Sequence, residues 1–119
     1  MHVMTEALQI ATHYFELSNK SDAKGIARLF TDSTTYSSQA TGIYLGQKDI
    51  IAMQRTFHDR FKFLHWTVNS VDEVKSGIVL FDYDFTGTLP SGEKIESSGL
   101  EYVIVLNGKI QHIEIRSKE

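Results

Sequence analysis

Three side chains in this sequence could carry acid–base chemistry in an apolar pocket: Tyr14, His58 and Tyr102. A tyrosine hydroxyl can donate a hydrogen bond to a ligand oxygen, and a histidine can exchange a proton near neutral pH. Tyr14 lies within the apolar stripe of a predicted helix, where simple packing explains it equally well. His58 lies at the edge of a helix's apolar face and is the candidate general base, although a surface histidine is the commoner explanation.

Other familiar catalytic arrangements receive little support. Asp82 and Asp84 resemble the paired carboxylates of a glycosidase or a metal site, but a solvated strand face explains them better. The 5 histidines show no i, i+4 spacing on one helix, so no metal site is expected. Ser37 and Ser38 lack a G-x-S-x-G context. We expect neither a metal nor a cofactor.

The composition excludes several classes of protein. The 119 residues, 41% of them hydrophobic, can form one domain over residues 1–119 with a buried core. A net charge of −3 without a run of like charges provides no basic face for nucleic acid. The absence of cysteine excludes disulfides and thiolate chemistry. Without a basic N-terminal region or an apolar run of membrane-spanning length, we expect a cytoplasmic protein that does not contact membranes.

The pattern predicts helices first and strands afterwards, which is typical of an α+β fold. Apolar residues recur at helical spacing in the predicted helices, and Thr5 and either Ser21 or Asp22 are good N-caps. Asn107-Gly108 is the strongest hairpin signal in the chain. The predicted elements are a helix over 5–18, a short helix ending near Phe30, a short strand at 34–36, a loop between Gly42 and Gly46, a helix over 47–60, and strands over 62–74, 78–89, 94–106 and 109–116.

Turn lengths then predict which strand residues face the helices. A two-residue turn at Asn107-Gly108 places Tyr102 opposite Ile113, and a two-residue turn at Ser91-Gly92 places Phe81 opposite Tyr102. The two pairings agree with each other. The predicted inner face consists of Val79, Phe81, Tyr83, Phe85, Leu100, Tyr102, Ile104, Ile113 and Ile115.

The same pairing predicts an outer face that is too apolar to stay in water. It holds four acids and His112, together with a set of aliphatic side chains, so we expect a homodimer through this face. The acids are Asp82, Asp84, Glu101 and Glu114, and the aliphatic side chains are Ile78, Leu80, Val103, Val105 and Ile110. The register of strand 62–74 is left open, and with it whether His65 or Trp66 points inward.

The order of these motifs resembles the nuclear transport factor 2-like superfamily, in its SnoaL-like and ketosteroid isomerase-like branch. The resemblance is carried by N-K-S-D-A-K-G-I-A-R-L-F at residues 19–30, by the Gly42 to Ile50 segment and by N-G-K-I at residues 107–110. It implies a cone-shaped fold with three helices on a curved antiparallel sheet around an apolar pocket, usually in a dimer.

The resemblance also implies a site. The isomerases of this branch pair a tyrosine on the first helix with a protonated acid on a late strand, and use an aspartate as base. Their tyrosine matches Tyr14 and their base matches Ser38, which cannot abstract a carbon-bound proton. Their acid matches Tyr102, or Glu101 after a shift of one residue; the strand pairing favours Tyr102. The expected pocket residues are Tyr36, Ser38, Met53, Phe57, Trp66, Phe81, Tyr83, Leu100, Ile104 and Ile113.

Three functions remain open from the sequence. The first is binding of a small apolar molecule whose carbonyl or hydroxyl is held by Tyr14 and Tyr102. The second is a cofactor-independent isomerase, cyclase or dehydratase of polycyclic or polyketide-like substrates, with His58 as a candidate base. The third is a protein-interaction module that uses the outer face of the sheet.

Overall fold

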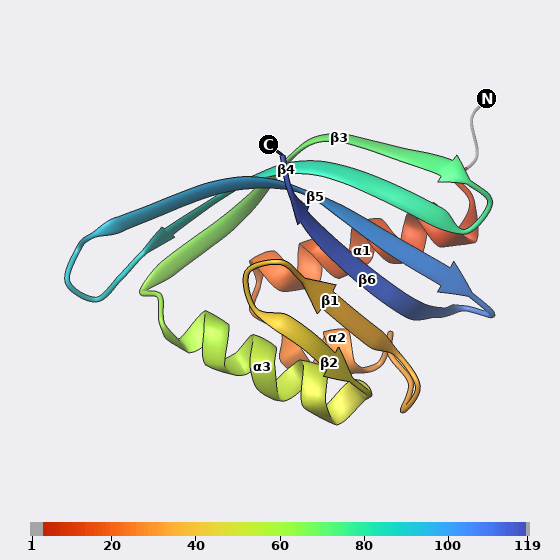
Figure 1. Cartoon of the computed structure of the whole chain (residues 1–119), viewed down its shortest axis with the longest axis horizontal. Coiled ribbons are helices and arrows are strands. Elements are labelled where there is room, and N and C mark those ends of the chain that lie inside the picture. Colours follow the sequence, from red (N-terminus) through yellow and green to blue (C-terminus); the bar gives the residue numbers. More distant parts are fainter. Residues whose placement is uncertain (1–3, 119) are drawn as a thin grey trace.

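A computed structural model describes residues 4–118, which form three helices and one six-stranded sheet (Figure 1). The α+β prediction is confirmed. The elements are α1 (Glu6–Asn19), α2 (Ala23–Ala27), β1 (Thr35–Ser38), β2 (Gly42–Leu45), α3 (Gln47–Asp59), β3 (Phe63–Lys75), β4 (Ile78–Thr88), β5 (Lys94–Leu106) and β6 (Lys109–Ser117).

Helices α1 and α2 begin where the sequence predicts, because polar side chains cap their first turns. The Thr5 hydroxyl accepts a hydrogen bond from the Leu8 amide at 3.1 Å. The Asp22 carboxylate accepts one from the Gly25 amide at 2.9 Å, so Asp22 is the cap of α2. Each bond satisfies an amide that has no partner within its own helix.

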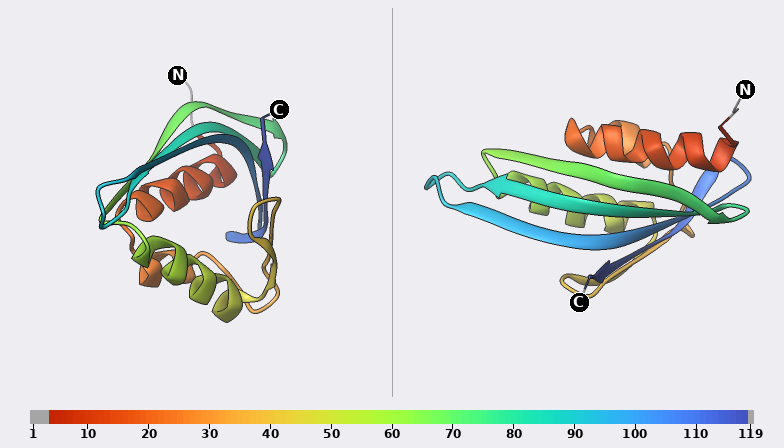
Figure 2. Two further views of the ribbon diagram at one scale, coloured as in Figure 1. Left: turned by 60° about the vertical axis from the view of Figure 1, so that its left-hand side comes forward. Right: turned by 90° about the horizontal axis from the view of Figure 1, so that it is seen from above.

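The sheet curls around α1, with α3 across the open side of the curve (Figure 2). Its strand order is β2-β1-β6-β5-β4-β3, and β1 runs parallel to β6 while the other neighbours are antiparallel. Strand β2 takes the place of the loop predicted between Gly42 and Gly46. The sequence did not predict this strand, because its residues show no alternation of apolar and polar side chains. Neither Ile43 nor Leu45 lies on a buried face, since they are 72% and 67% exposed.

The pairing of β5 with β6 departs from the prediction after one step. Leu106 lies opposite Lys109 as expected, and Val105 lies opposite Ile110. The next pair is Ile104 with His112, so Gln111 is an extra residue on β6 and forms a β-bulge. Beyond the bulge every residue of β5 faces a partner one position later than predicted.

The turn between β4 and β5 is also one residue longer than predicted. The Leu89 amide donates to the Glu93 carbonyl at 2.8 Å, which leaves three residues, 90–92, in the turn. Phe81 therefore lies opposite Glu101. The bulge and the longer turn each displace β5 by one residue, relative to β6 and to β4 respectively, so both errors reverse the face of β5. For that reason the two wrong pairings agreed with each other.

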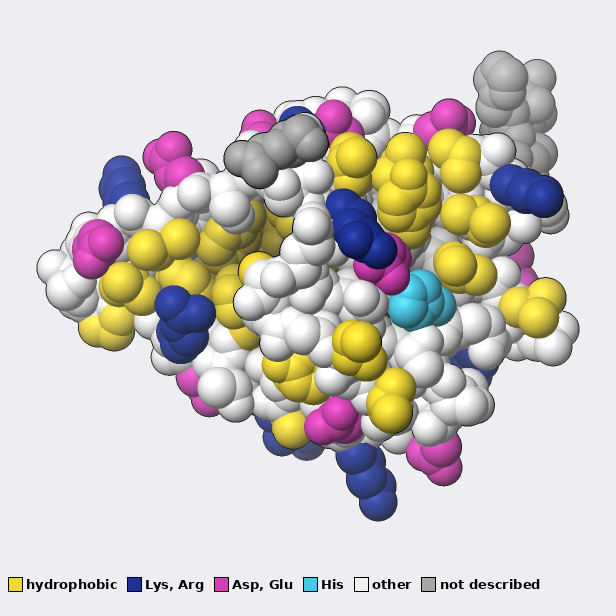
Figure 3. All heavy atoms as spheres, in the orientation of Figure 1, with side chains coloured by type: hydrophobic (Ala, Val, Ile, Leu, Met, Phe, Trp, Pro, Cys, Tyr) yellow, Lys and Arg dark blue, Asp and Glu magenta, His cyan; other side chains and the backbone are white. Residues whose placement is uncertain are grey.

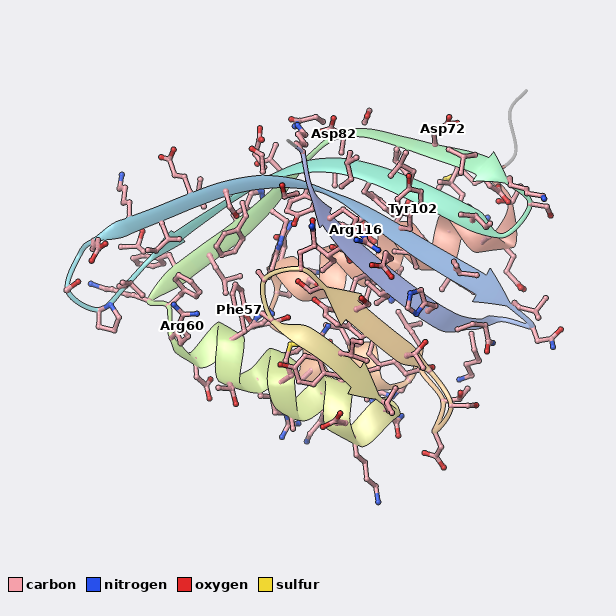
Figure 4. The ribbon with its side chains drawn as sticks, in the orientation of Figure 1. Phe57, Arg60, Asp72, Asp82, Tyr102 and Arg116 are labelled. Carbon is pink, nitrogen blue, oxygen red and sulfur yellow. The ribbon has the colours of Figure 1, made fainter. Side chains whose placement is uncertain are left out.

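These shifts exchange the two faces of β5. Glu101, Val103 and Val105 point toward the helices and are 3%, 0% and 6% exposed. The prediction was wrong for six side chains besides Glu101: Leu100, Tyr102 and Ile104 lie on the outer face, and Val103, Val105 and Ile110 lie on the inner one. Figure 4 shows Tyr102 and Asp82 on the side of the sheet that faces away from the helices.

The core lies between α1 and the concave face of the sheet. Phe15 of α1 stacks on Phe81 of β4 with ring centroids 4.1 Å apart. Phe81 and Ile113 are 1% and 0% exposed, so both serve packing. On β3, Trp66 lies opposite Phe85 with ring centroids 4.9 Å apart, which places its ring on the inner face. The core thus fills one end of the cone, and the aromatic side chains of the other end surround a cavity.

Candidate active site

The cavity lies between α1, α3 and the concave face of the sheet, and has a volume of about 150 Å³. Strands β1, β3, β4, β5 and β6 all contribute side chains to its wall. The lining residues are Tyr14, Phe15, Ser18, Tyr36, Ser38, Ala40, Thr41, Met53, Gln54, Phe57, His58, Trp66, Tyr83, Phe85, Ser97, Glu101 and Ile115. Figure 4 shows Phe57 near the C-terminal end of α3. An apolar wall with a few polar groups is typical of small-molecule sites.

Glu101 is the most unusual group in this wall. Its side chain is 3% exposed, and within the residues that the structure describes its Oε2 atom has no hydrogen-bond partner. Burial raises the pKa of Glu101 to about 8, because the surrounding apolar groups cannot solvate a carboxylate. At neutral pH Glu101 is therefore a neutral carboxylic acid that can donate a hydrogen bond.

Tyr14 is a second donor in the same cavity. Gln54 of α3 donates from Nε2 to the Tyr14 hydroxyl at 2.8 Å, and the Ser18 side chain also hydrogen-bonds to Tyr14. Burial, followed by the nearby Glu101 charge, raises the pKa of Tyr14 well above its usual value. Tyr14 stays protonated throughout the physiological range. Tyr14 and the protonated Glu101 are therefore two neutral hydroxyl groups in one cavity wall that can donate to a ligand.

Two further tyrosines complete the polar part of the wall. Tyr36 of β1 lies beside Ile113 of β6, and burial raises its pKa. The Tyr83 hydroxyl packs over Gly99, where an added Cβ would lie 2.7 Å from the hydroxyl oxygen. Burial and then the Glu101 charge raise the pKa of Tyr83 as well. Gly99 thus interrupts the apolar pattern of β5 to make room for a hydroxyl.

His58 lies on the wall where α3 approaches α2. Its Nδ1 atom is 2.8 Å from the Ser21 hydroxyl, and its ring centroid is 5.4 Å from that of Trp66. Burial lowers the pKa of His58, because desolvation disfavours the imidazolium. At neutral pH the ring is therefore uncharged and can accept a proton. Ser21 holds the ring in one orientation.

Ser38 occupies the position of the isomerase base and does not replace it chemically. Its side chain lines the cavity, is 8% exposed and accepts a hydrogen bond from the Ala40 amide at 3.2 Å. A serine hydroxyl with this partner is a polar contact and not a base.

The predicted site residues fall into three groups. Tyr14, Tyr36, Ser38, Met53, Phe57, His58, Trp66 and Tyr83 line the cavity. Phe81 and Ile113 lie on the inner face but belong to the core, and Leu100, Tyr102 and Ile104 lie outside. The prediction missed Gln54 and Ser18, and it placed Glu101 on the wrong face. One signal for Glu101 existed: it is the acid within the apolar run of residues 100–106.

Asp82 and Asp84 form no paired-carboxylate site. Both lie on the outer face, where Lys118 contacts Asp82 at 2.6 Å and Asn69 donates to both carboxylates. Among residues 4–118, no group of three or more His, Asp and Glu side chains is arranged to hold a metal ion. Within the same residues, no helix is long and apolar enough to cross a membrane.

A cone of helices on a curved sheet, closed around an apolar cavity with polar donors, defines the nuclear transport factor 2-like fold. The sequence profile of the SnoaL-like domain matches residues 11–113. The chain therefore belongs to the SnoaL-like family.

Solved structures agree on this fold. A proposed SnoaL-like polyketide cyclase from Shewanella putrefaciens CN-32 superposes with a TM-score of 0.81 at 14% identity, over 95% of this chain and 90% of its own. An NTF2-like protein of unknown function from Burkholderia pseudomallei K96243 superposes with a TM-score of 0.84 at 13% identity, over 97% of this chain and 92% of its own. An LEH-like epoxide hydrolase from M. tuberculosis superposes with a TM-score of 0.80 at 12% identity, over 92% of this chain and 80% of its own. No curated protein sequence matches this chain.

Proposed function

We propose that this protein binds a small, mainly apolar molecule whose carbonyl or hydroxyl oxygen accepts hydrogen bonds from Tyr14 and the protonated Glu101. The observation that carries the proposal is the buried Glu101 acid, whose Oε2 atom has no hydrogen-bond partner among residues 4–118. A buried polar group without a partner costs stability, and a ligand oxygen would satisfy it. Glu101 thus replaces Tyr102 as the second anchor.

The size of the cavity limits the ligand. An apolar cavity of about 150 Å³ accommodates a molecule of about the size of benzene. Monocyclic ketones and phenols are therefore the first molecules to test.

Replacing Tyr14 with Phe is expected to weaken ligand binding about tenfold, the usual effect of losing one hydrogen bond of about 1.4 kcal/mol. The affinities of wild type and Tyr14→Phe for the ketones and phenols would be measured by isothermal titration calorimetry. Tyr44→Phe is the matched control, since the Tyr44 hydroxyl donates to the Thr41 carbonyl and Tyr44 does not line the cavity. Equal losses in the two variants would contradict a direct contact with Tyr14.

A second candidate is an isomerase, cyclase or dehydratase that moves a proton beside a carbonyl. The observation in its favour is that a neutral acid, Glu101, and an uncharged imidazole, His58, line one cavity. Environments that push two groups toward opposite roles are typical of acid–base sites. The structurally similar proteins include a proposed polyketide cyclase and an epoxide hydrolase, which supports a reaction on a small molecule.

Proton exchange tests this candidate without knowledge of the product. A ketone that binds would be incubated with the protein in D₂O, and the loss of its α-proton signal followed by NMR. Exchange should be fast with the wild type and slowed by at least about a hundredfold in His58→Gln, the usual contribution of a general base. A His58→Gln protein that still binds the ketone and exchanges it at the wild-type rate would contradict the role of His58.

We further propose that the outer face of the sheet forms a homodimer. Hydrophobic side chains gather over β4 and β5 on this face (Figure 3), and five of them are partly buried: Ile78, Leu80, Leu100, Tyr102 and Ile104. A patch of this kind on a sheet commonly marks an interface.

Ile104→Asp is expected to convert the dimer to a folded monomer, because a carboxylate would be desolvated at the centre of the interface. Sedimentation velocity measures the change in mass. A wild type that is monomeric at every concentration would contradict the dimer. It would favour the alternative that this face binds a different protein, as in an interaction module.

A further inference from the structure

We infer that the same cavity also takes a small organic cation, a tertiary or quaternary ammonium, which places its charge against the Glu101 carboxylate. The inference rests on the proposed function to the extent that the cavity must admit a small molecule. It goes beyond that function because the ligand is a cation and not a neutral carbonyl or hydroxyl compound. A carbonyl needs a hydrogen-bond donor, whereas an alkylated ammonium needs a negative charge and aromatic faces.

Once Glu101 is ionised, the lining of the cavity provides a negative charge with no cation beside it to balance it. Among the lining residues in the described range 4–118, Glu101 is the sole carboxylate, and none is a lysine or arginine. Its Oε2 atom has no hydrogen-bond partner in the described part of the chain, and its side chain is 3% exposed. A buried carboxylate is stable only beside a compensating cation. Because the cavity wall contains no such cation, a bound ligand would have to supply it.

The aromatic side chains provide the second half of an ammonium site. Phe57, Trp66 and Phe85 form a contiguous aromatic wall, with ring centroids 6.2 Å apart for Phe57 and Trp66 and 5.6 Å apart for Phe57 and Phe85. Tyr14 and Tyr83 line the same cavity. Aromatic faces attract alkylated ammonium groups, whose methyl groups are themselves apolar and need no hydrogen bond. A trimethylammonium group is also close to benzene in size, which matches the volume of the cavity.

The remaining titratable groups around Glu101 do not oppose a cation. Tyr14 on α1, Tyr36 on β1 and Tyr83 on β4 are neutral, because burial raises the pKa of each. His58 on α3 is uncharged at neutral pH, because burial lowers its pKa. Glu101 ionises at about pH 8, so a cation gains affinity as the pH rises through that value. A neutral ligand that accepts a hydrogen bond from the Glu101 acid loses affinity over the same range.

The test compares choline with 3,3-dimethylbutan-1-ol, which differ in having nitrogen or carbon at the branched centre. Isothermal titration calorimetry would give both affinities at pH 6 and pH 9. Choline should bind about a hundredfold more tightly at pH 9, since about one protein molecule in a hundred has Glu101 ionised two pH units below its pKa. The alcohol should not gain affinity between the two values, and should bind more weakly than choline at pH 9.

Glu101→Gln is the matched variant, because it keeps the shape of the side chain and removes the charge. It should bind the alcohol and lose the preference for choline at pH 9. A wild type that binds the alcohol or the ketones but not choline at pH 9 would overturn the inference and leave the proposed function intact. Choline binding that is unchanged in Glu101→Gln would also overturn it. Failure of every neutral and cationic ligand would overturn both proposals.

Discussion

Glu101→Gln is expected to be more stable than the wild type above pH 8, by on the order of 5 kcal/mol, and nearly equal to it at pH 4.5. The pKa of Glu101 rises from 4.5 to about 8 on folding because the side chain is buried. Between these values the unfolded chain has released the proton and the folded chain has kept it. The folded state binds more protons, so the free energy of unfolding falls by about 1.4 kcal/mol per pH unit. Glutamine has no proton to lose.

Urea unfolding of both proteins at pH 4.5, 6, 7.5 and 9 measures this difference. His58 titrates in part of the same range with the opposite sign, because its pKa is lowered on folding and its contribution to stability rises with pH. Subtracting the two proteins at each pH removes that contribution. A difference that stays constant from pH 4.5 to 9 would show that Glu101 is ionised in the folded state at neutral pH. Its role as a hydrogen-bond donor would then be wrong.

The cost of Glu101 is itself an argument for function. An apolar side chain at this position would pack against Tyr14 and the facing strands without a desolvation penalty. Two residues earlier, Gly99 has no side chain, and the Tyr83 hydroxyl occupies the space that a Cβ would need. Two departures from the apolar pattern on one strand both serve the polar part of one cavity. Departures from local rules that concentrate in one place are typical of binding and catalytic sites.

The elements of the fold could be predicted because each leaves a local signal. Thr5 and Asp22 cap helices that begin where expected, and Asn107-Gly108 turns between β5 and β6. These features depend on a few neighbouring residues. Strand β2 was missed because its side chains are mostly exposed, and a short exposed strand has no hydrophobic period.

The site could be predicted only in part, because it depends on register. The helix residues Tyr14, Met53, Phe57 and His58 line the cavity as expected, since helical periodicity alone selects their face. Strand β5 was assigned the wrong face because nothing in the sequence marks Gln111 as a bulge, and because the two-residue prediction overlooked a turn signal. Pro90-Ser91-Gly92, with Gly92 at a positive φ of 92°, is typical of a three-residue turn. A shift of one residue turns every side chain of a strand over. It exchanged Glu101 with Tyr102, and with them the chemistry of the site.

The register of β5 is tested most directly by an aspartate at two adjacent positions. Val103→Asp is expected to destabilise the protein by more than about 4 kcal/mol, which for a domain of this size is enough to unfold most of it. Val103 is 0% exposed and lies opposite Val79 on one side and Ile113 on the other. A carboxylate at this position would be buried among aliphatic side chains with no cation to pair with.

Ile104→Asp is the matched control, with the same new charge one residue further along the same strand. Ile104 is partly exposed on the outer face, so the monomer should lose no more than about 1 kcal/mol. Circular dichroism during urea unfolding separates the two variants, at a protein concentration where both are monomeric. The register predicted from the turns alone requires the opposite order, with Ile104→Asp unfolded and Val103→Asp stable. Because Glu101 lies two residues before Val103, the face that this experiment assigns to Val103 is also the face of the acid.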